Sequence, residues 1–313
     1  MFVRNSLCVA LVASAALAGG CGTGIASTQY NTPERLQRGL VLILPGIEGA
    51  GALSSAVRGG IDDAGIRQGL SIYRWGVPIS VAGLMWNQMD TARARKVAGE
   101  VAEEIASYQD AHPDRPVHLV GHSGGGAVAV FTAEQLPGDH RVDGIVLLSP
   151  SLSAGYDLTK ALSGSRKGIV HFWSPADVGL LVLGTTLFGN LDGVHGPAAG
   201  ARGFRQTNGP NELFSRLHQI RWSSAMASSW NLGGHVGTAS RAFCRDWAAP
   251  WIKATQWPVP DGDEESSAMP EPATQSEPAT QPEPATPSVP AAQPKPDAQP
   301  EPATPSAPPP SDS

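Results

Sequence analysis

Apolar runs alternate with amphipathic runs through the middle of this 313-residue chain. The segment GLVLILPG (39–46) is an unbroken apolar run that ends in Pro-Gly, which is typical of a parallel strand buried on both faces. Residues 91–112 show the other pattern, with Val97, Val101 and Ile105 on one stripe and charged residues on the opposite side. The first segment therefore predicts a strand and the second a helix.

The same two patterns recur in turn along the chain. Strand-like runs occupy residues 39–46, 70–77, 116–123, 142–151, 168–177 and 218–226. Helix-like runs occupy residues 52–65, 91–112, 124–136, 156–164 and 238–252. Because βαβ units place successive strands in parallel, we predict an α/β domain over residues 39–257. It holds a doubly wound, mostly parallel sheet of about six strands with helices on both faces. Ligands bind at the carboxyl ends of such strands.

The first 21 residues have the features of an export signal. Arg4 supplies a positive start, and the apolar stretch 7–18 is shorter than the about 20 residues that span a bilayer. The ending LAGGC resembles a bacterial lipobox, in which Cys21 becomes the lipidated first residue. We expect an exported cell-envelope protein that contacts the membrane through a lipid on Cys21. The alternatives are a periplasmic or secreted protein and an uncleaved anchor.

The remaining outer segments differ in composition from the predicted domain. Residues 22–38 are predicted to be a polar lead-in linker. Residues 258–313 contain EPAT four times and 17 of the 28 prolines, so we expect a disordered tail. From residue 261 onward the net charge is −9, which leaves +3 for the rest of the chain. With no basic block, no nucleic-acid partner is expected. Only Cys244 lies within the domain, so no internal disulfide is expected.

One motif in the third strand–helix unit carries candidate chemistry. The segment LVGHSGGGAVAV places Ser123 in the pattern G-x-S-x-G, with Gly121 and Gly125 on either side. Between a strand and a helix, this pattern indicates a strained turn that lifts the serine hydroxyl above the sheet. Gly124 leaves its N–H open beside the positive end of the helix. The alternative is a turn whose glycines serve packing alone.

With these residues the chain resembles the α/β-hydrolase superfamily of esterases and lipases over about residues 39–252. The resemblance implies a nucleophilic serine, an acid and a histidine in that order along the chain. Ser123 would be the nucleophile. His235, in the glycine-rich loop NLGGHVGTAS after the last strand, lies where the family has its base, and His195 is the alternative.

The acid of the family follows the strand two after the serine. Asp177, directly after the strand predicted over residues 168–177, stands at that place. Asp192 is the alternative. Asp157 opens a helix after the preceding strand, where a carboxylate serves as an N-cap.

The resemblance also implies an oxyanion hole after the first strand. In LPGIEGAG (44–51) the backbone N–H of Ile47 would pair with that of Gly124. Each such donor stabilises a developing alkoxide by about 3–4 kcal/mol. The alternative is a plain glycine turn. Glu48 adds a charge that either orients a substrate or faces solvent.

Together these residues predict an enzyme that cleaves a carboxylic ester through an acyl-enzyme on Ser123. The substrate would be a small-molecule or lipid ester, although the same groups also serve thioesters and amides. The apolar segments 84–89 and 178–190 are candidates to line an acyl pocket. No metal-ligand spacing or phosphate-binding loop is seen, so no cofactor or metal is expected. The alternative is a non-catalytic envelope protein of the same fold that binds a partner through its Pro-rich tail.

Overall fold

A computed structural model of the chain describes residues 29–75, 90–177, 189–205 and 211–258. The predicted signal segment with Cys21, the Pro-rich tail and most of the two candidate pocket segments lie outside these ranges. The chain divides into two units, residues 1–267 and 268–313, and the fold described here belongs to the first. No helix within the described ranges is long and apolar enough to cross a membrane.

A six-stranded, entirely parallel sheet forms the centre of this unit. Its strands are β1 (Leu40–Leu44), β2 (Gly69–Ile72), β3 (Val117–His122), β4 (Gly144–Leu148), β5 (Ile169–Trp173) and β6 (Leu217–Arg221). They lie in the order β2-β1-β3-β4-β5-β6. The predicted α/β class and the parallel six-stranded sheet are therefore confirmed.

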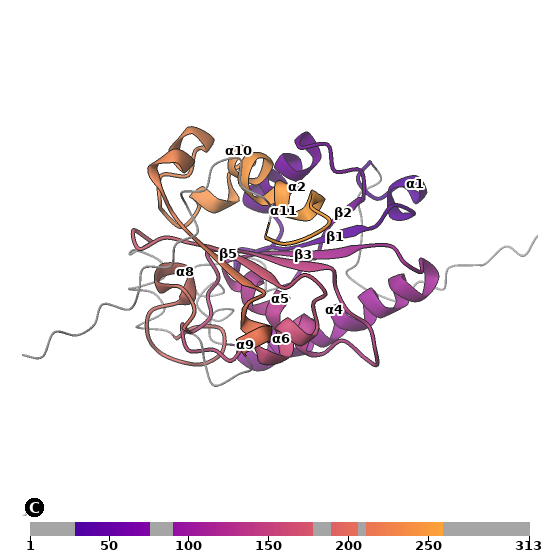
Figure 1. Cartoon of the computed structure of the whole chain (residues 1–313), viewed down its shortest axis with the longest axis horizontal. Coiled ribbons are helices and arrows are strands. Elements are labelled where there is room, and N and C mark those ends of the chain that lie inside the picture. Colours follow the sequence, from indigo (N-terminus) through magenta and orange to yellow (C-terminus); the bar gives the residue numbers. More distant parts are fainter. Residues whose placement is uncertain (1–28, 76–89, 178–188, 206–210, 259–313) are drawn as a thin grey trace, which may run out of the picture. The chain divides into compact units, whose positions relative to one another are not determined.

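Helices cover both faces of the sheet (Figure 1). One face carries α4 (Thr91–Ala111), α5 (Gly124–Glu134), α6 (Thr159–Ser163), α8 (Ala199–Arg202) and α9 (Asn211–Phe214). The other carries α1 (Pro33–Leu36), α2 (Ala52–Asp63), α10 (Arg241–Phe243) and α11 (Ala249–Lys253). Two 3-10 turns, Ser224–Ser229 and Gly237–Ala239, and a π turn, Cys244–Ala248, complete the described elements.

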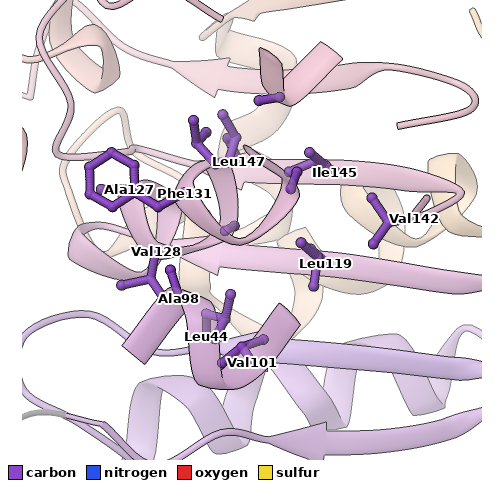
Figure 2. Close-up of a cluster of buried hydrophobic side chains, with 14 of the residues drawn as sticks. Leu44, Ala98, Val101, Leu119, Ala127, Val128, Phe131, Val142, Ile145 and Leu147 are labelled. Carbon is purple, nitrogen blue, oxygen red and sulfur yellow. The ribbon is translucent and has the colours of Figure 1, made fainter. Parts of the chain in front are cut away.

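The unbroken apolar run of β1 follows from its position between two helical layers. Leu42 and Leu44 pack into the core under α4 and α5, whereas Val41 and Ile43 pack into the core under α2. Successive side chains of a strand point to opposite faces, so a strand covered on both sides needs apolar residues at every position. Figure 2 shows the first of these cores, with Phe131 of α5 against the strands.

The strand order fixes where a site can form. From β1 the chain crosses to β2 on one side and then returns to β3 on the other. Segments that leave two neighbouring strands toward opposite sides separate at the carboxyl ends, and ligands bind there in open α/β sheets. The loop 45–51 follows β1 and Ser123 follows β3, so the candidate residues meet at this point.

Part of the expected lead-in is packed against the domain. The Arg35 guanidinium donates to Asp62 Oδ1 at 2.9 Å and to the carbonyl of Gln68 at 2.9 Å. The Tyr108 hydroxyl donates to the carbonyl of Leu36. These bonds hold the segment against α2 and α4, so the packed part of the chain includes residues 29–38.

The last helix, predicted as continuous over residues 238–252, is divided in the structure into α10, the π turn and α11. Pro250 has no amide hydrogen and cannot continue the ordinary bonding ladder. The wider turn lets the amide of Ala249 donate to the carbonyl of Cys244 instead. Cys244 itself is fully buried, and its side chain faces Gly60 of α2.

Candidate active site

Ser123 occupies a strained backbone conformation between β3 and α5. Its φ of 54° and ψ of −123° lie in a region that residues other than glycine rarely adopt. The turn is held by the sheet, because the Ser123 amide donates to Leu148 O at 3.0 Å. Its carbonyl accepts from the amides of Gly126 and Ser151, each at 3.0 Å. The main chain therefore fixes the position of the hydroxyl.

Close backbone contact explains the glycines on either side. A Cβ atom at Gly121 would lie 2.5 Å from Gly125 O. A Cβ atom at Gly125 would overlap the carbonyl oxygens of Leu44 and Pro45. The turn is thus pressed against the end of β1 and has no room for side chains at these two positions.

The structure brings the three predicted residues into one hydrogen-bonded chain. His235 Nε2 lies 2.9 Å from Ser123 Oγ, and His235 Nδ1 lies 2.8 Å from Asp177 Oδ2. Asp177 is only 2% exposed. A carboxylate accepts hydrogen bonds, so Nδ1 carries the proton and the lone pair of Nε2 faces the serine hydroxyl. In this arrangement the imidazole is oriented to take up the serine proton.

The alternative residues have other partners. Asp192 accepts a hydrogen bond from Ser153 Oγ, and Asp157 Oδ1 accepts from the Thr159 amide at 2.9 Å, in the turn that precedes α6. His195 lies in the loop 189–196, where its ring faces Gly189. Within the described ranges, no group of three or more His, Cys, Asp and Glu side chains is arranged to hold a metal ion.

The loop after β1 places Ile47 beside Gly124. The Gly49 amide donates to Gly46 O at 2.9 Å, and Gly49 has a φ of 76°, so the loop makes a tight turn. A Cβ atom at Gly124 would lie 2.9 Å from Ile47 Cγ2. The two amides expected to form the oxyanion hole therefore belong to adjoining segments.

Trp75 packs against this loop and bonds its main chain, a role that the sequence analysis missed. Its indole N–H donates to Pro45 O at 2.8 Å, and its ring would lie 3.4 Å from a Cβ atom at Gly124. The side chain is 7% exposed. The position of Trp75 just after β2 was the available signal, but only the strand order shows that β2 lies beside β1.

A second histidine–carboxylate pair adjoins the triad. Nε2 of His122 lies 3.2 Å from the backbone oxygen of His235, and its Nδ1 lies 3.9 Å from Glu48 Oε1. Burial raises the pKa of Glu48 and lowers the pKa of His122 to about 3. Glu48 Oε1 and His122 Nδ1 have no hydrogen-bond partner among the described residues. In both groups burial acts against the charged form.

The loop that carries His235 is tied down by side chains. Thr238 Oγ1 donates to His235 O at 3.4 Å and lies 3.2 Å from Ser149 Oγ. The Gly233 amide donates to Asn231 Oδ1 at 3.1 Å. No local pattern in the sequence pointed to these residues, because Ser149 and Thr238 lie on separate elements.

The same loop exposes three large apolar side chains. Trp230 is 75% exposed, Leu232 73% and Val236 53%. Trp230 also adopts a left-handed backbone conformation, with a φ of 63°. The loop, residues 230–240, is called the base loop below.

Comparisons with known proteins find similarities over parts of the chain. Residues 89–174 match the family model of the alpha/beta hydrolase fold. Human monoglyceride lipase is 44% identical over 55 residues, which are 18% of this chain and 18% of that enzyme. Aspergillus fumigatus lipase B has a TM-score of 0.47 and 11% identity, over 74% of this chain and 56% of that one. A predicted hydrolase from Thermoplasma acidophilum has a TM-score of 0.38 and 15% identity, over 73% of this chain and 89% of that one.

The matched segment contains α4, β3, the serine turn, α5, β4, α6 and β5, and so includes three neighbouring strands of the sheet and Ser123. The parallel sheet continues on both sides of this segment, with β1 and β2 on one side and β6 on the other. The family model thus matches the central part of a fold that has the parallel sheet and helical layers of an α/β hydrolase.

Proposed function

We propose that the protein is a serine hydrolase that cleaves carboxylic esters through an acyl-enzyme on Ser123. The single observation that carries the proposal is the continuous hydrogen-bonded chain from Ser123 Oγ through His235 to Asp177. A serine hydroxyl is a weak nucleophile alone, and a base held within hydrogen-bond reach and oriented by an acid activates it.

The reaction follows from these contacts. Ser123 Oγ attacks the ester carbonyl while its proton passes to His235 Nε2. The negative charge on the former carbonyl oxygen is stabilised by the amides of Gly124 and Ile47. The ester C–O bond then breaks, and the leaving alcohol takes the proton from Nε2. Water then attacks the acyl-enzyme while His235 takes its proton. The bond to Ser123 breaks, the carboxylic acid is released, and Ser123 takes the proton back from His235. Asp177 stabilises the imidazolium in both half-reactions.

The ester is the proposed substrate class because two of the similar proteins are lipases. Thioesters and amides undergo the same acyl transfer, so they belong in the same assay. We therefore propose to compare p-nitrophenyl esters of increasing acyl length with matched thioesters and anilides. Esters are expected to show the highest kcat/KM.

A fluorophosphonate probe tests the nucleophile directly. We expect intact mass and peptide mapping to show one probe on Ser123. Ser123→Ala should abolish labelling and lower kcat by about 10⁶-fold. Ser163→Ala, on the exposed side of α6, is the control and should change neither. A folded protein that stays unlabelled and inactive toward the whole panel would contradict the proposal and favour a binding protein of the same fold.

A further inference from the structure

His122, next to the proposed nucleophile, turns its ring away from Ser123 and toward the base loop. It is 4% exposed, and its Nε2 lies 3.2 Å from the backbone oxygen of His235. A carbonyl oxygen can only accept, so Nε2 must carry a proton for this contact to be a hydrogen bond. That bond joins the serine turn to the main chain of the residue proposed as the base.

The proton on Nε2 leaves a lone pair on His122 Nδ1, unless a second proton is bound. Nδ1 faces Glu48 Oε1 at 3.9 Å, and both atoms are buried. An ionised carboxylate facing that lone pair would be repulsive, and it would favour moving the ring proton to Nδ1. Two favourable contacts, one to Glu48 and one to His235 O, need two protons on the pair.

A neutral Glu48 satisfies this count. With the acid protonated and the imidazole neutral, Glu48 donates toward Nδ1 while Nε2–H donates to His235 O. The direction of both pKa shifts agrees, since burial raises the pKa of Glu48 and lowers that of His122. Glu48 is itself held over Gly46, where a Cβ atom would overlap its carboxyl group.

We propose that Glu48 and His122 act as a pair that positions His235, with the protonated acid of Glu48 facing His122 Nδ1 and His122 holding the main chain of the base loop. The pair joins the oxyanion loop, the serine turn and the base loop. It does not touch the reacting atoms, so both are positioning residues. The inference rests on the proposed function, because it takes His235 to be the base.

The proposal predicts a pH dependence with a definite sign. As pH rises through the raised pKa of Glu48, the acid loses its proton. The carboxylate then attracts the ring proton to Nδ1, and Nε2 turns a lone pair toward His235 O. The other titratable group that contacts His122 within the described ranges is His235, whose ring centre is 5.1 Å away. The contact is therefore intact at low pH and weakened at high pH.

Two substitutions test the pair. His122→Phe keeps an aromatic ring and removes the donor, so kcat for a p-nitrophenyl ester should fall about 10- to 100-fold with KM within about twofold. Amide hydrogen exchange over residues 230–240 should become faster, a result that does not depend on catalysis. His122→Gln restores a donor and should recover part of both losses.

Glu48→Gln tests the proton on the acid. Its amide can donate to Nδ1 at every pH, so the variant should lose the decline in kcat that the ionisation of Glu48 causes in the wild type as pH rises. Glu104→Gln is the matched control, since Glu104 on α4 is also partly buried with a raised pKa but faces no histidine. It should leave the pH profile unchanged. If His122→Phe fails to fold, the pH dependence of kcat of Glu48→Gln tests the proposal by itself.

The two proposals fail in different ways. A folded wild type that is inactive and unlabelled at Ser123 overturns the proposed function. An active wild type whose kcat, pH profile and base-loop exchange are unchanged by both substitutions overturns the pair and leaves the triad intact.

Discussion

The serine turn and the base loop meet at two hydrogen bonds to His235, yet they are built differently. Around Ser123 the chain is buried, and backbone atoms block side chains at Gly121 and Gly125. In the base loop Trp230 and Leu232 are exposed, and a Cβ atom at Gly234 would meet nothing within 4 Å. The main chain and sheet thus fix the nucleophile, whereas a few side-chain hydrogen bonds fix the base.

The largest expected effect concerns the side chain that orients the base. Asp177→Asn should lower kcat by about 10⁴-fold, because an amide favours the wrong tautomer of His235. Its melting temperature should stay close to that of the wild type. Asp192→Asn is the control, since Asp192 bonds Ser153 and not His235. Equal losses in steady-state kinetics for the two variants would contradict the assigned acid.

Two glycine substitutions compare the stability of the two regions. Gly125→Ala should lower the free energy of unfolding by more than about 4 kcal/mol or prevent folding, because its Cβ would overlap the backbone at the end of β1. Gly234→Ala should change it by less than about 0.5 kcal/mol. Urea unfolding of both proteins measures the difference. Similar values would mean that the base loop is as tightly constrained as the turn.

Two substitutions of Ser123 test whether the backbone of the turn is strained. Glycine adopts positive φ without penalty, whereas alanine does not, so Ser123→Gly should be more stable than Ser123→Ala by about 1–3 kcal/mol. Both variants lack the hydroxyl, which makes each the control for the other. A more stable alanine variant in thermal unfolding would show that the turn is unstrained.

The smallest effect is expected for Thr238→Val, which keeps the shape and removes the hydroxyl. His235 O would lose its second, 3.4 Å donor, and Ser149 would lose a partner. Stability should fall by about 1 kcal/mol, and kcat should fall only a few-fold. Thr159→Val on α6 is the control, since the Thr159 hydroxyl bonds Asp157 and not His235, and it should leave kcat unchanged. A loss as large as that of His122→Phe would make Thr238 the main anchor of the loop.

Much of the fold was predictable because its signals are local. The unbroken apolar run of β1 and the stripe of α4 each follow from the burial of that one element. The serine turn was predictable for the same reason, since its whole pattern lies in one short segment between a strand and a helix, although Gly125 also packs against Leu44 and Pro45 at the end of β1. Asp177 and His235 needed the family resemblance, because nothing in their own segments distinguishes them from Asp192 and His195.

The remaining features depend on contacts between distant segments. Trp75 reaches Pro45 only because β2 lies beside β1, and His122 reaches the base loop across 113 residues of sequence. The loop 189–198 is ordered by backbone bonds such as Leu191 N to Ser151 O, which leave no periodic pattern. Such contacts are invisible until the topology is known.

Cys244 has a practical consequence. Its thiol lies behind the base loop, where it donates to Thr238 O at 3.4 Å, and burial raises its pKa. Alkylating reagents attack exposed thiolates, so they reach this sulfur only when the segment opens. The rate at which Cys244 is alkylated under native conditions therefore measures how often the segment around it opens. The measurement uses a residue that the chain already contains, so no probe has to be introduced.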